Sequence, residues 1–357
     1  MTTSFFLVKW LFQAMNWVYQ QMSAAFSGGG WVVVLTIFLF TLGIKLITVF
    51  SDIKSRKSSL QMQQIQPDLD KLKKKYGNDP QKLNTEQRKL MKERGVSQLG
   101  GCLPMLIMLP LLFMFFDAFR AWSNQQTLSL MVDIANGKGV ETFANYRFLW
   151  ITNIWRPDNL IGGSTLMKAS EFWSTFASTN FVKNFIFYEK NADALNQILY
   201  KLHFFTITTG ENGAIEYVLA NDGGAAFRAA YDAFVLPITG NVQLLGGEYA
   251  NMSNGFAILP ILAGATTFLS SWIMQKSQPK PAAKTENKDD PAAQTQNMGK
   301  WMMYLMPLMS VFFCWRYDST FAFYWIFSNI FSLAVTLILN ATVFKKMQTE
   351  PMEVLKK

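Results

Sequence analysis

Long apolar segments constrain this chain more than any other feature of its sequence. Residues 31–50 (WVVVLTIFLFTLGIKLITVF) contain a single charged side chain. About 20 apolar residues are what an α-helix needs to cross the hydrocarbon core of a bilayer. Half of the 357 residues are hydrophobic and only 16% are charged, which is far from the composition of a soluble globular protein. The sequence therefore predicts a membrane protein.

Five segments have the composition expected of membrane-spanning helices. They cover residues 31–50, 102–119, 256–274, 301–315 and 321–344. The fourth segment is short, so it is expected to cross together with flanking residues or in a thinned region of bilayer. The predicted fold class is an all-α polytopic membrane protein with five transmembrane helices.

The basic residues are concentrated in a few of the connecting segments. Residues 51–98 carry twelve Lys or Arg against six Asp or Glu, whereas residues 123–250 carry eight against eleven. Cytoplasmic loops of membrane proteins are enriched in Lys and Arg. We therefore place residues 51–98, 276–298 and the short basic tail 345–357 in the cytoplasm, with the N-terminus and residues 123–250 outside. The net charge of +9 then indicates topology and no specific nucleic-acid partner.

The cytoplasmic segment 51–98 has the punctuation of a helical hairpin. Gly77 and Asn78 form a turn, and Asp79 followed by Pro80 is typical of a helix N-terminus. We predict helices at about 67–76 and 80–94. Residues 276–298 are rich in Pro, Ala, Lys, Asp and Gln without an apolar period, which predicts a flexible linker.

The two segments placed outside differ in what they predict. Within residues 1–30, the stretch 4–26 has a recurring apolar face and is expected to form an interfacial amphipathic helix. A cleaved signal peptide is the alternative, because AAFSGG resembles a cleavage region. Residues 123–250 are long enough to bury a small core, but their fold is not evident from the sequence.

The usual motifs of catalytic and metal sites are missing from the sequence. It contains one histidine, His203, and two cysteines, Cys102 and Cys314, in or beside apolar segments. There is no HExxH, CxxC, GxSxG or Walker-type glycine loop. We therefore predict no catalytic residues, no cofactor, no metal and no enzyme activity.

Lys45 is the most informative single residue. A lysine deep in a span costs about 2.5 to 3.5 kcal/mol on insertion scales, so it usually faces a water-filled cavity or a partner. The alternative is snorkelling, because Lys45 lies only five residues from the predicted cytoplasmic end of its span.

Small polar residues accompany Lys45 in the later spans. Interhelical packing explains most of them. However, the inner half of the spans has no acid to pair with the lysine, since Asp117 lies near the outer end of its span beside Arg120 and is expected to pair locally. This distribution favours a hydrated groove over a proton relay or a metal site. The residues concerned are Thr266, Thr267, Ser270, Ser271, Ser310, Ser328, Asn329, Ser332, Thr336 and Asn340.

Several segments, in order and spacing, resemble the YidC family of membrane protein insertases. The resemblance covers all five spans and the hairpin. It rests on QPDLDKLKKKYGND (66–79), LGGCLPMLIMLPLLF (99–113), FLWITNIWRPD (148–158), ILPILAGATTF (258–268) and MPLMSVFFCWRYDSTFAFYWIFSN (306–329). It implies spans arranged around a hydrophilic groove that opens to the cytoplasm and to lipid.

The resemblance also implies which residues line this groove. Lys45 stands where the family usually has an arginine, so the positive charge is kept and the planar guanidinium is lost. Thr41, one turn before Lys45, and Ser270 are placed on the groove wall. Tyr324 and Trp325 are placed there too, although aromatic residues also form interfacial belts. Ser328 and Asn329 complete the expected set.

The implied function is assistance to the insertion and folding of integral membrane proteins, alone or beside the Sec translocon. The implied partners are nascent membrane proteins, membrane lipids, the Sec translocon, the ribosome and the signal recognition particle pathway. The implied location is a bacterial plasma membrane. The alternatives are a secondary transporter or channel, for which we see no internal repeat, and an accessory subunit of a membrane complex.

One segment departs from the pattern of compact members of the family. The loop after FLWITNIWRPD, about residues 159–248, is longer than expected, and nothing in it names a ligand. It is either a chaperone-like or partner-docking insertion or a decoration of one lineage.

Overall fold

The computed structural model is mostly helical and divides into two compact units. It describes residues 3–95, 103–160, 165–177, 186–210, 213–222, 224–241, 253–276 and 291–341. Unit 1 consists of residues 1–38, 114–261 and 311–324, and unit 2 consists of residues 39–113, 262–310 and 325–357. Cys102, where the predicted second span begins, and the predicted basic tail 345–357 lie outside the described residues.

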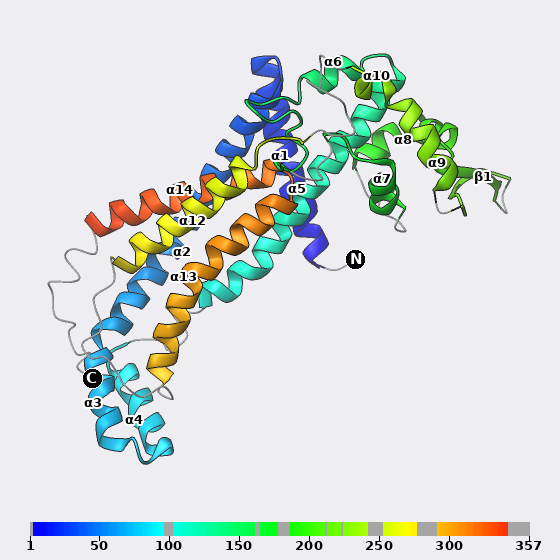
Figure 1. Ribbon diagram of the computed structural model, residues 1–357. Helices are drawn as coiled ribbons and strands as arrows, with labels where there is room; N and C mark the ends of the chain where they lie inside the picture. Colours follow the sequence, from blue (N-terminus) through cyan, green and yellow to red (C-terminus); the bar gives the residue numbers. More distant parts are fainter. Residues whose placement is uncertain are drawn as a thin grey trace. The chain divides into compact units, whose positions relative to one another are not determined.

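The long helices carry the predicted spans (Figure 1). They are α2 (Gly30–Gln64), α5 (Leu103–Ala135), α12 (Ile258–Lys276), α13 (Pro291–Arg316) and α14 (Ser319–Leu339). Helix α1 (Thr3–Phe26), which carries the expected interfacial segment, precedes them. Within the described residues, Gly30–Lys54 of α2 and the whole of α14 are long and apolar enough to cross a membrane, and Ile258–Met274 of α12 is a shorter apolar helix. The predicted spans 102–119 and 301–315 fall on α5 and α13, and their crossing remains a prediction.

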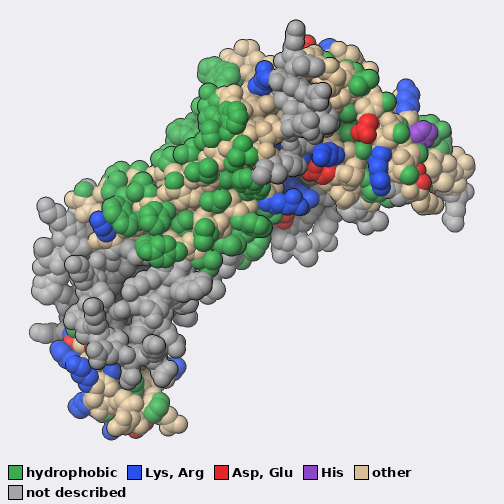
Figure 2. Space-filling view, in the orientation of Figure 1, with side chains coloured by type: hydrophobic (Ala, Val, Ile, Leu, Met, Phe, Trp, Pro, Cys, Tyr) green, Lys and Arg blue, Asp and Glu red, His purple; other side chains and the backbone are tan. Residues whose placement is uncertain are grey.

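Large apolar side chains are exposed along these helices. Figure 2 shows them gathered over α12, α13 and α14. Ile47 of α2 is 77% exposed and Leu308 of α13 is 67% exposed. Exposed apolar patches of this extent mark a surface that another apolar phase or a partner covers. Lipid tails satisfy that requirement for helices of this length.

A basic helical hairpin belongs to unit 2. Its helices are α3 (Gln66–Tyr76) and α4 (Pro80–Glu93), which pack through Ile65, Leu69, Leu90 and Met91. The predicted start of the second helix coincides with α4, because Asp79 accepts a hydrogen bond from the backbone N–H of Lys82 at 3.0 Å. Several Lys and Arg side chains lie on its surface (Figure 2).

Two predicted boundaries need correction. Residues 291–298, predicted as part of a flexible linker, form the first turns of α13. Pro291 stands at the first helical position, where its missing N–H costs nothing, and two alanines with high helix propensity follow it. The rest of that linker, residues 277–290, lies outside the described residues. Consequently α13 is longer than the short segment expected at 301–315.

The N-terminal helix α1 packs with one face inside unit 1. Leu11, Phe12 and Met15 of α1 are buried, whereas Phe6 is 72% and Trp17 is 63% exposed. Apolar residues therefore lie on both faces of α1. This fits a helix that has one face against the protein and the other at the lipid interface. The interfacial position itself remains a prediction.

The long loop after residue 158 folds into a small domain within unit 1. Its elements, with α6 (Gly139–Ala144) before them, are α7 (Ala169–Phe176), α8 (Ile186–Lys201), β1 (Phe205–Thr209), β2 (Ile215–Leu219), α9 (Ala225–Phe234) and α10 (Leu236–Thr239). Strands β1 and β2 pair antiparallel, with Ile207 opposite Tyr217. The all-α prediction therefore omits a small β-hairpin.

Aromatic rings form the core of this small domain. Phe172, Phe204, Phe227 and Tyr231 are buried, and their ring centroids lie 5.2 to 5.7 Å apart where they meet. Gly224 begins α9 with a φ of 83°, and a Cβ there would come within 2.6 Å of the Trp173 ring. Glycine is required at that position because of both the left-handed backbone and the close approach of the ring.

The two ends of this domain meet at its base. Buried Asn254 donates to the backbone oxygens of Asn153 at 2.7 Å, Arg156 at 3.2 Å and Pro157 at 3.1 Å. Asp158 accepts from the backbone N–H groups of Ala257 at 3.0 Å and Leu259 at 2.8 Å. These bonds satisfy N–H groups at the start of α12. Nearly one hundred residues of chain are thus closed into a loop beside the start of α12.

Candidate functional site

A polar stripe runs along one face of α14 in unit 2. Trp325, Asn329, Ser332 and Thr336 are spaced by four, three and four residues, which places them on the same face of a helix. The opposite face of α14 is apolar, with Ile330, Leu337 and Ile338 exposed. The stripe is therefore the polar face of an otherwise apolar helix.

The N-terminal part of this stripe is hydrogen-bonded to α12. Trp325 Nε1 donates to Thr267 Oγ1 at 3.0 Å, and Asn329 Nδ2 donates to the same oxygen at 2.8 Å and to Thr266 Oγ1 at 3.3 Å. Ser270 Oγ donates to the backbone oxygen of Asn329 at 3.3 Å. Hydrogen bonds between membrane helices contribute about 0.6 kcal/mol each on average. The network holds α12 and α14 in one register.

Helix α13 joins this network through Ser310. The hydroxyl oxygens of Ser310 and Thr267 lie 3.0 Å apart, and both residues are buried. Ser310 also donates to the backbone oxygen of Met306 at 2.8 Å. A buried hydroxyl in an apolar helix needs such a partner, because leaving it unpaired costs free energy.

The C-terminal part of the stripe contacts the lysine of α2. Lys45 Nζ donates to Ser332 Oγ at 2.9 Å, and both side chains are half-buried. Thr41, one turn earlier on α2, is fully buried. The Lys45 ammonium therefore lies against the α14 stripe, with a hydroxyl as an acceptor.

Tyr324 and Ser328 have different surroundings from the other expected site residues. Tyr324 belongs to unit 1, where its ring lies 4.7 Å from that of Phe115 and 5.3 Å from that of Phe119. Ser328 is half-buried on α14, one turn before Ser332. Within unit 2, the structure thus brings together Ser270, Trp325 and Asn329 in one network, and Lys45 with Ser332 in a second contact.

The sequence analysis counted several of these contact residues among the polar groups of the spans but did not predict their partners. Thr266, Thr267, Ser310 and Ser332 are the hydroxyl partners of the expected groove residues. The spacing of 325, 329, 332 and 336 was the available signal for a stripe. Nothing in the sequence names α12 or α2 as the facing helix.

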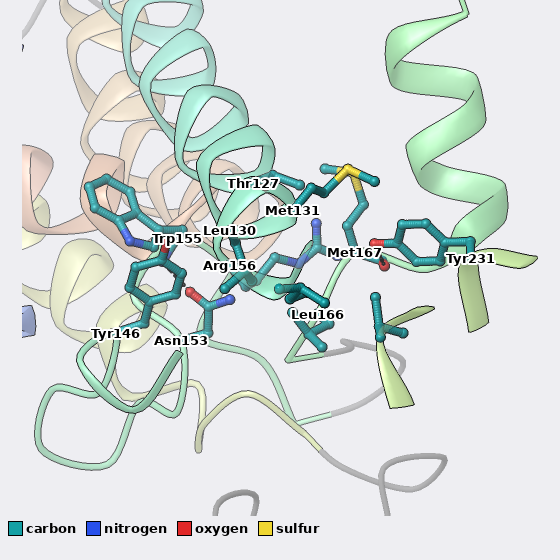
Figure 3. Close-up of a pocket in the computed structure, with 12 residues that line it drawn as sticks. Thr127, Leu130, Met131, Tyr146, Asn153, Trp155, Arg156, Leu166, Met167 and Tyr231 are labelled. Carbon is teal, nitrogen blue, oxygen red and sulfur yellow. Dashed lines mark hydrogen bonds between the residues drawn. The ribbon is translucent and has the colours of Figure 1, made fainter. Parts of the chain in front are cut away.

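A second polar centre lies in unit 1 around Arg156. Its guanidinium donates to both carboxylate oxygens of Glu171, at 2.9 Å and 2.6 Å. Figure 3 shows Arg156 between Tyr146 and Asn153 on one side and Met167 and Tyr231 on the other. They line a cavity of about 20 Å³, which is room for one water molecule. The cavity is too small for a substrate.

Two ionisable groups at this centre have perturbed pKa values. Burial lowers the pKa of Arg156, but the hydrogen bonds and charge of Glu171 offset it, so the pKa lies above its usual range. Burial raises the pKa of Asp318 to about 6, against the opposing effect of Arg156. This centre joins α7 to the turn before α14, and its side chains stabilise that junction.

Within the part of the chain that the structure describes, no group of three or more His, Cys, Asp or Glu residues is placed to hold a metal ion. The chemistry available at the α14 stripe is hydrogen bonding and the charge of Lys45.

The comparisons with known proteins all point to one family. The sequence profile of the family described as "60Kd inner membrane protein" matches residues 24–222 and 225–347. The chain is 34% identical over 178 residues to the membrane protein insertase YidC of Clostridium perfringens, which is 50% of this chain and 66% of that protein. It is 26% identical over 309 residues to the YidC of Chlorobaculum tepidum, which is 87% of this chain and 33% of that protein.

A third relative matches a shorter segment more closely. The chain is 42% identical over 87 residues to the membrane protein insertase YidC of Fusobacterium nucleatum, which is 24% of this chain and 42% of that protein. The matched segments thus span between 33% and 66% of the lengths of these three relatives. Because the family profile matches most of its residues, the chain belongs to the family of 60 kDa inner membrane proteins, the YidC family.

Proposed function

We propose that this protein is a membrane protein insertase, which assists the insertion and folding of integral membrane proteins without a covalent reaction. The observation that carries the proposal is the half-buried Lys45, held by Ser332 on the polar face of α14 in a member of the YidC family. A lysine in an apolar helix costs about 2.5 to 3.5 kcal/mol on insertion scales. A role in binding the polar part of a substrate explains that cost.

The proposed path for the substrate is the polar face shared by α2, α12 and α14. The polar and acidic outer segment of the substrate is attracted to the Lys45 ammonium. This attraction lowers the free energy of moving the segment through hydrocarbon. The apolar segment leaves sideways along the exposed apolar side chains of α12 and α14. Lys45, Thr41, Ser270, Tyr324, Trp325, Ser328 and Asn329 are the proposed groove residues.

The proposed energy source is the substrate and the membrane. Burial of the apolar segment in lipid drives the transfer, at about 0.8 kcal/mol per buried CH₂ group. For an acidic segment that moves outward, the membrane potential adds about 2.3 kcal/mol per charge per 100 mV. The scheme has no step that requires a nucleotide, a cofactor or a metal.

The proposed setting is the bacterial plasma membrane, with five spans, the N-terminus outside and the C-terminus in the cytoplasm. The basic α3–α4 hairpin then faces the cytoplasm and receives nascent membrane proteins, while lipids surround the apolar helices. Because the chain belongs to the YidC family, the Sec translocon, the ribosome and the signal recognition particle pathway are also proposed as partners.

The test is complementation of insertase-depleted bacteria with the full chain, Lys45→Arg or Lys45→Ala. Insertion of a single-spanning substrate with an acidic outer segment is measured by protease protection. We expect rescue by the unchanged chain and by Lys45→Arg. A charged group's hydrogen bond contributes about 1.5 to 3 kcal/mol, so Lys45→Ala should lower insertion about tenfold or more.

Expression of each variant in the membrane is the control. Equal rescue by all three chains would remove Lys45 from the mechanism and leave the insertase function. Failure of a well-expressed unchanged chain would contradict the insertase proposal and favour a transporter or an accessory subunit.

A further inference from the structure

The contact between Lys45 and Ser332 joins residues that are 287 positions apart in the chain. Lys45 Nζ is the donor and Ser332 Oγ is the acceptor, at 2.9 Å. Both side chains are half-buried, so a ligand on the polar face of α14 can reach them. An ammonium and a hydroxyl thus stand side by side on two helices of unit 2.

The chemistry of the two groups differs from that of a lone lysine. An ammonium has three N–H donors, and a serine hydroxyl that accepts one hydrogen bond keeps its own O–H for donation. A lysine alone acts on a carboxylate as a point charge, whereas an arginine offers two donors in a fixed fork. Lys45 and Ser332 together supply two donors on atoms 2.9 Å apart.

We propose that Lys45 and Ser332 form a two-donor binding site for one carboxylate of an inserting polypeptide, an Asp or Glu side chain of its outer segment. The inference rests on the insertase function proposed above and names its substrate contact. On binding, Lys45 Nζ donates to one carboxylate oxygen and Ser332 Oγ donates to the other. No bond is formed or broken beyond these hydrogen bonds.

The position of Ser332 is fixed by its neighbours on α14. Asn329, nearly one turn earlier, is bonded to Thr266 and Thr267 of α12. Thr336, one turn later, donates to the backbone oxygen of Ser332 at 2.6 Å. Serine needs only a rotation of its hydroxyl to change partner, so the site is organised before the carboxylate arrives.

Ser332 also holds the lysine side chain in place. The flexible stem of a lysine lets its ammonium reach the headgroup region when nothing holds it. The bond to Ser332 instead keeps the ammonium on the α14 face. Ser332 therefore supplies a second donor and also holds the Lys45 ammonium in place, neither of which a lone lysine provides.

The test uses the full chain with two substrates, one with an aspartate in its outer segment and one with asparagine at the same position. Insertion is measured by protease protection for Ser332→Ala and Ser332→Thr, each with Lys45 or with Lys45→Arg. Thr36→Ala is the control, because it removes a buried α2 hydroxyl that bonds to Val32 O of its own helix.

We expect Ser332→Ala to lower insertion of the aspartate substrate about fivefold, the effect of one hydrogen bond of about 1 kcal/mol. Ser332→Thr keeps the hydroxyl and should retain insertion. With Lys45→Arg the loss should fall below twofold, since the guanidinium carries its own second donor. Insertion of the asparagine substrate should be unchanged, as should insertion of both substrates by Thr36→Ala.

The outcomes separate this inference from the proposed function. If Lys45→Ala lowers insertion while Ser332→Ala does not, the two-donor site is wrong and the insertase function stands. If Ser332→Ala lowers insertion of both substrates equally, the hydroxyl only packs the helices and the site is again wrong. If Lys45→Ala inserts the aspartate substrate as well as the unchanged chain, the charged groove itself fails.

Discussion

Arg156 lies at the junction of three segments of unit 1. Its side chain pairs with Glu171 of α7, and its backbone oxygen accepts from Asn254 and from Ser319 Oγ, the latter at 2.7 Å. Asp318 feels the charge of Arg156 from the turn before α14. A single residue thereby fixes the start of α14, the base of the inserted domain and its first helix.

The raised pKa of Asp318 predicts a pH dependence of stability. Its folded-state pKa of about 6 lies above the ordinary value of 3.8, so the folded chain binds more protons than the unfolded chain between these values. Stability due to this group is therefore present below about pH 4 and falls as the pH rises to about 6. Asp318→Asn should raise the thermal midpoint of the detergent-solubilised protein more at pH 7.5 than at pH 4.5.

The neighbours that act on Asp318 are Arg156, Arg120, Ser123 and Glu171. Asp222→Asn is the matched control, because backbone N–H groups of Ala226 and Gly224 lower the pKa of Asp222 and leave it ionised at both pH values. Its effect on the midpoint should be nearly the same at pH 4.5 and 7.5. The account of Asp318 fails if Asp318→Asn gains no more at pH 7.5 than at pH 4.5.

At single positions, the sequence shows which residues are energetically unfavourable more readily than it shows which residues contact each other. Lys45 stands out because a charge in an apolar helix requires an explanation. Its acceptor Ser332 does not stand out, since serines in spans are common and the two helices are far apart in the chain. The same limit applies to Thr267, which accepts from both Trp325 and Asn329.

At the scale of elements, local signals predict helix ends and not domain cores. The Asp79–Pro80 pair predicts the start of α4 because capping is a contact within three residues. The aromatic core of the inserted domain joins Phe172 of α7 to Phe204 and Phe227, which are 32 and 55 positions later. No short period in the sequence encodes contacts over such distances.

The base of the inserted domain predicts a stability effect. Asn254→Ala removes three donated bonds and the 2.8 Å bond that Asn254 Oδ1 accepts from the backbone N–H of Asn153. The backbone N–H of Asn153 and the backbone oxygen of Pro157 lose these partners, and a buried unpaired group costs about 1 to 3 kcal/mol. We expect a loss of about 2 to 4 kcal/mol, seen as a lower thermal midpoint in detergent.

Asn221→Ala is the matched control for this prediction, since Asn221 is exposed in the same domain. Its effect should stay within about 0.5 kcal/mol. A midpoint for Asn254→Ala equal to that of Asn221→Ala would show that the base is held by other contacts, such as those of Asp158 with Ala257 and Leu259.

At the scale of the whole molecule, the account depends on one face of α14 facing the substrate and the other facing lipid. The stripe bearing Trp325, Asn329 and Ser332 is polar, whereas Ile330 is 47% exposed and apolar. Composition and charge predicted a membrane protein, and family membership agrees with that prediction. The number of spans and their orientation remain predictions, because among the described residues only α2 and α14 are long and apolar enough to cross a membrane.

The most direct test of the substrate path is site-specific photocrosslinking during insertion. A benzoylphenylalanine probe is placed at Ser328 or at Ile330, which lie about 200° apart around α14 and at nearly the same depth. A ribosome-bound substrate with an acidic outer segment is stalled during insertion. We predict that the substrate crosslinks from position 328 and much less from position 330. Equal crosslinking from both positions, or crosslinking from 330 alone, would contradict a path along the polar face.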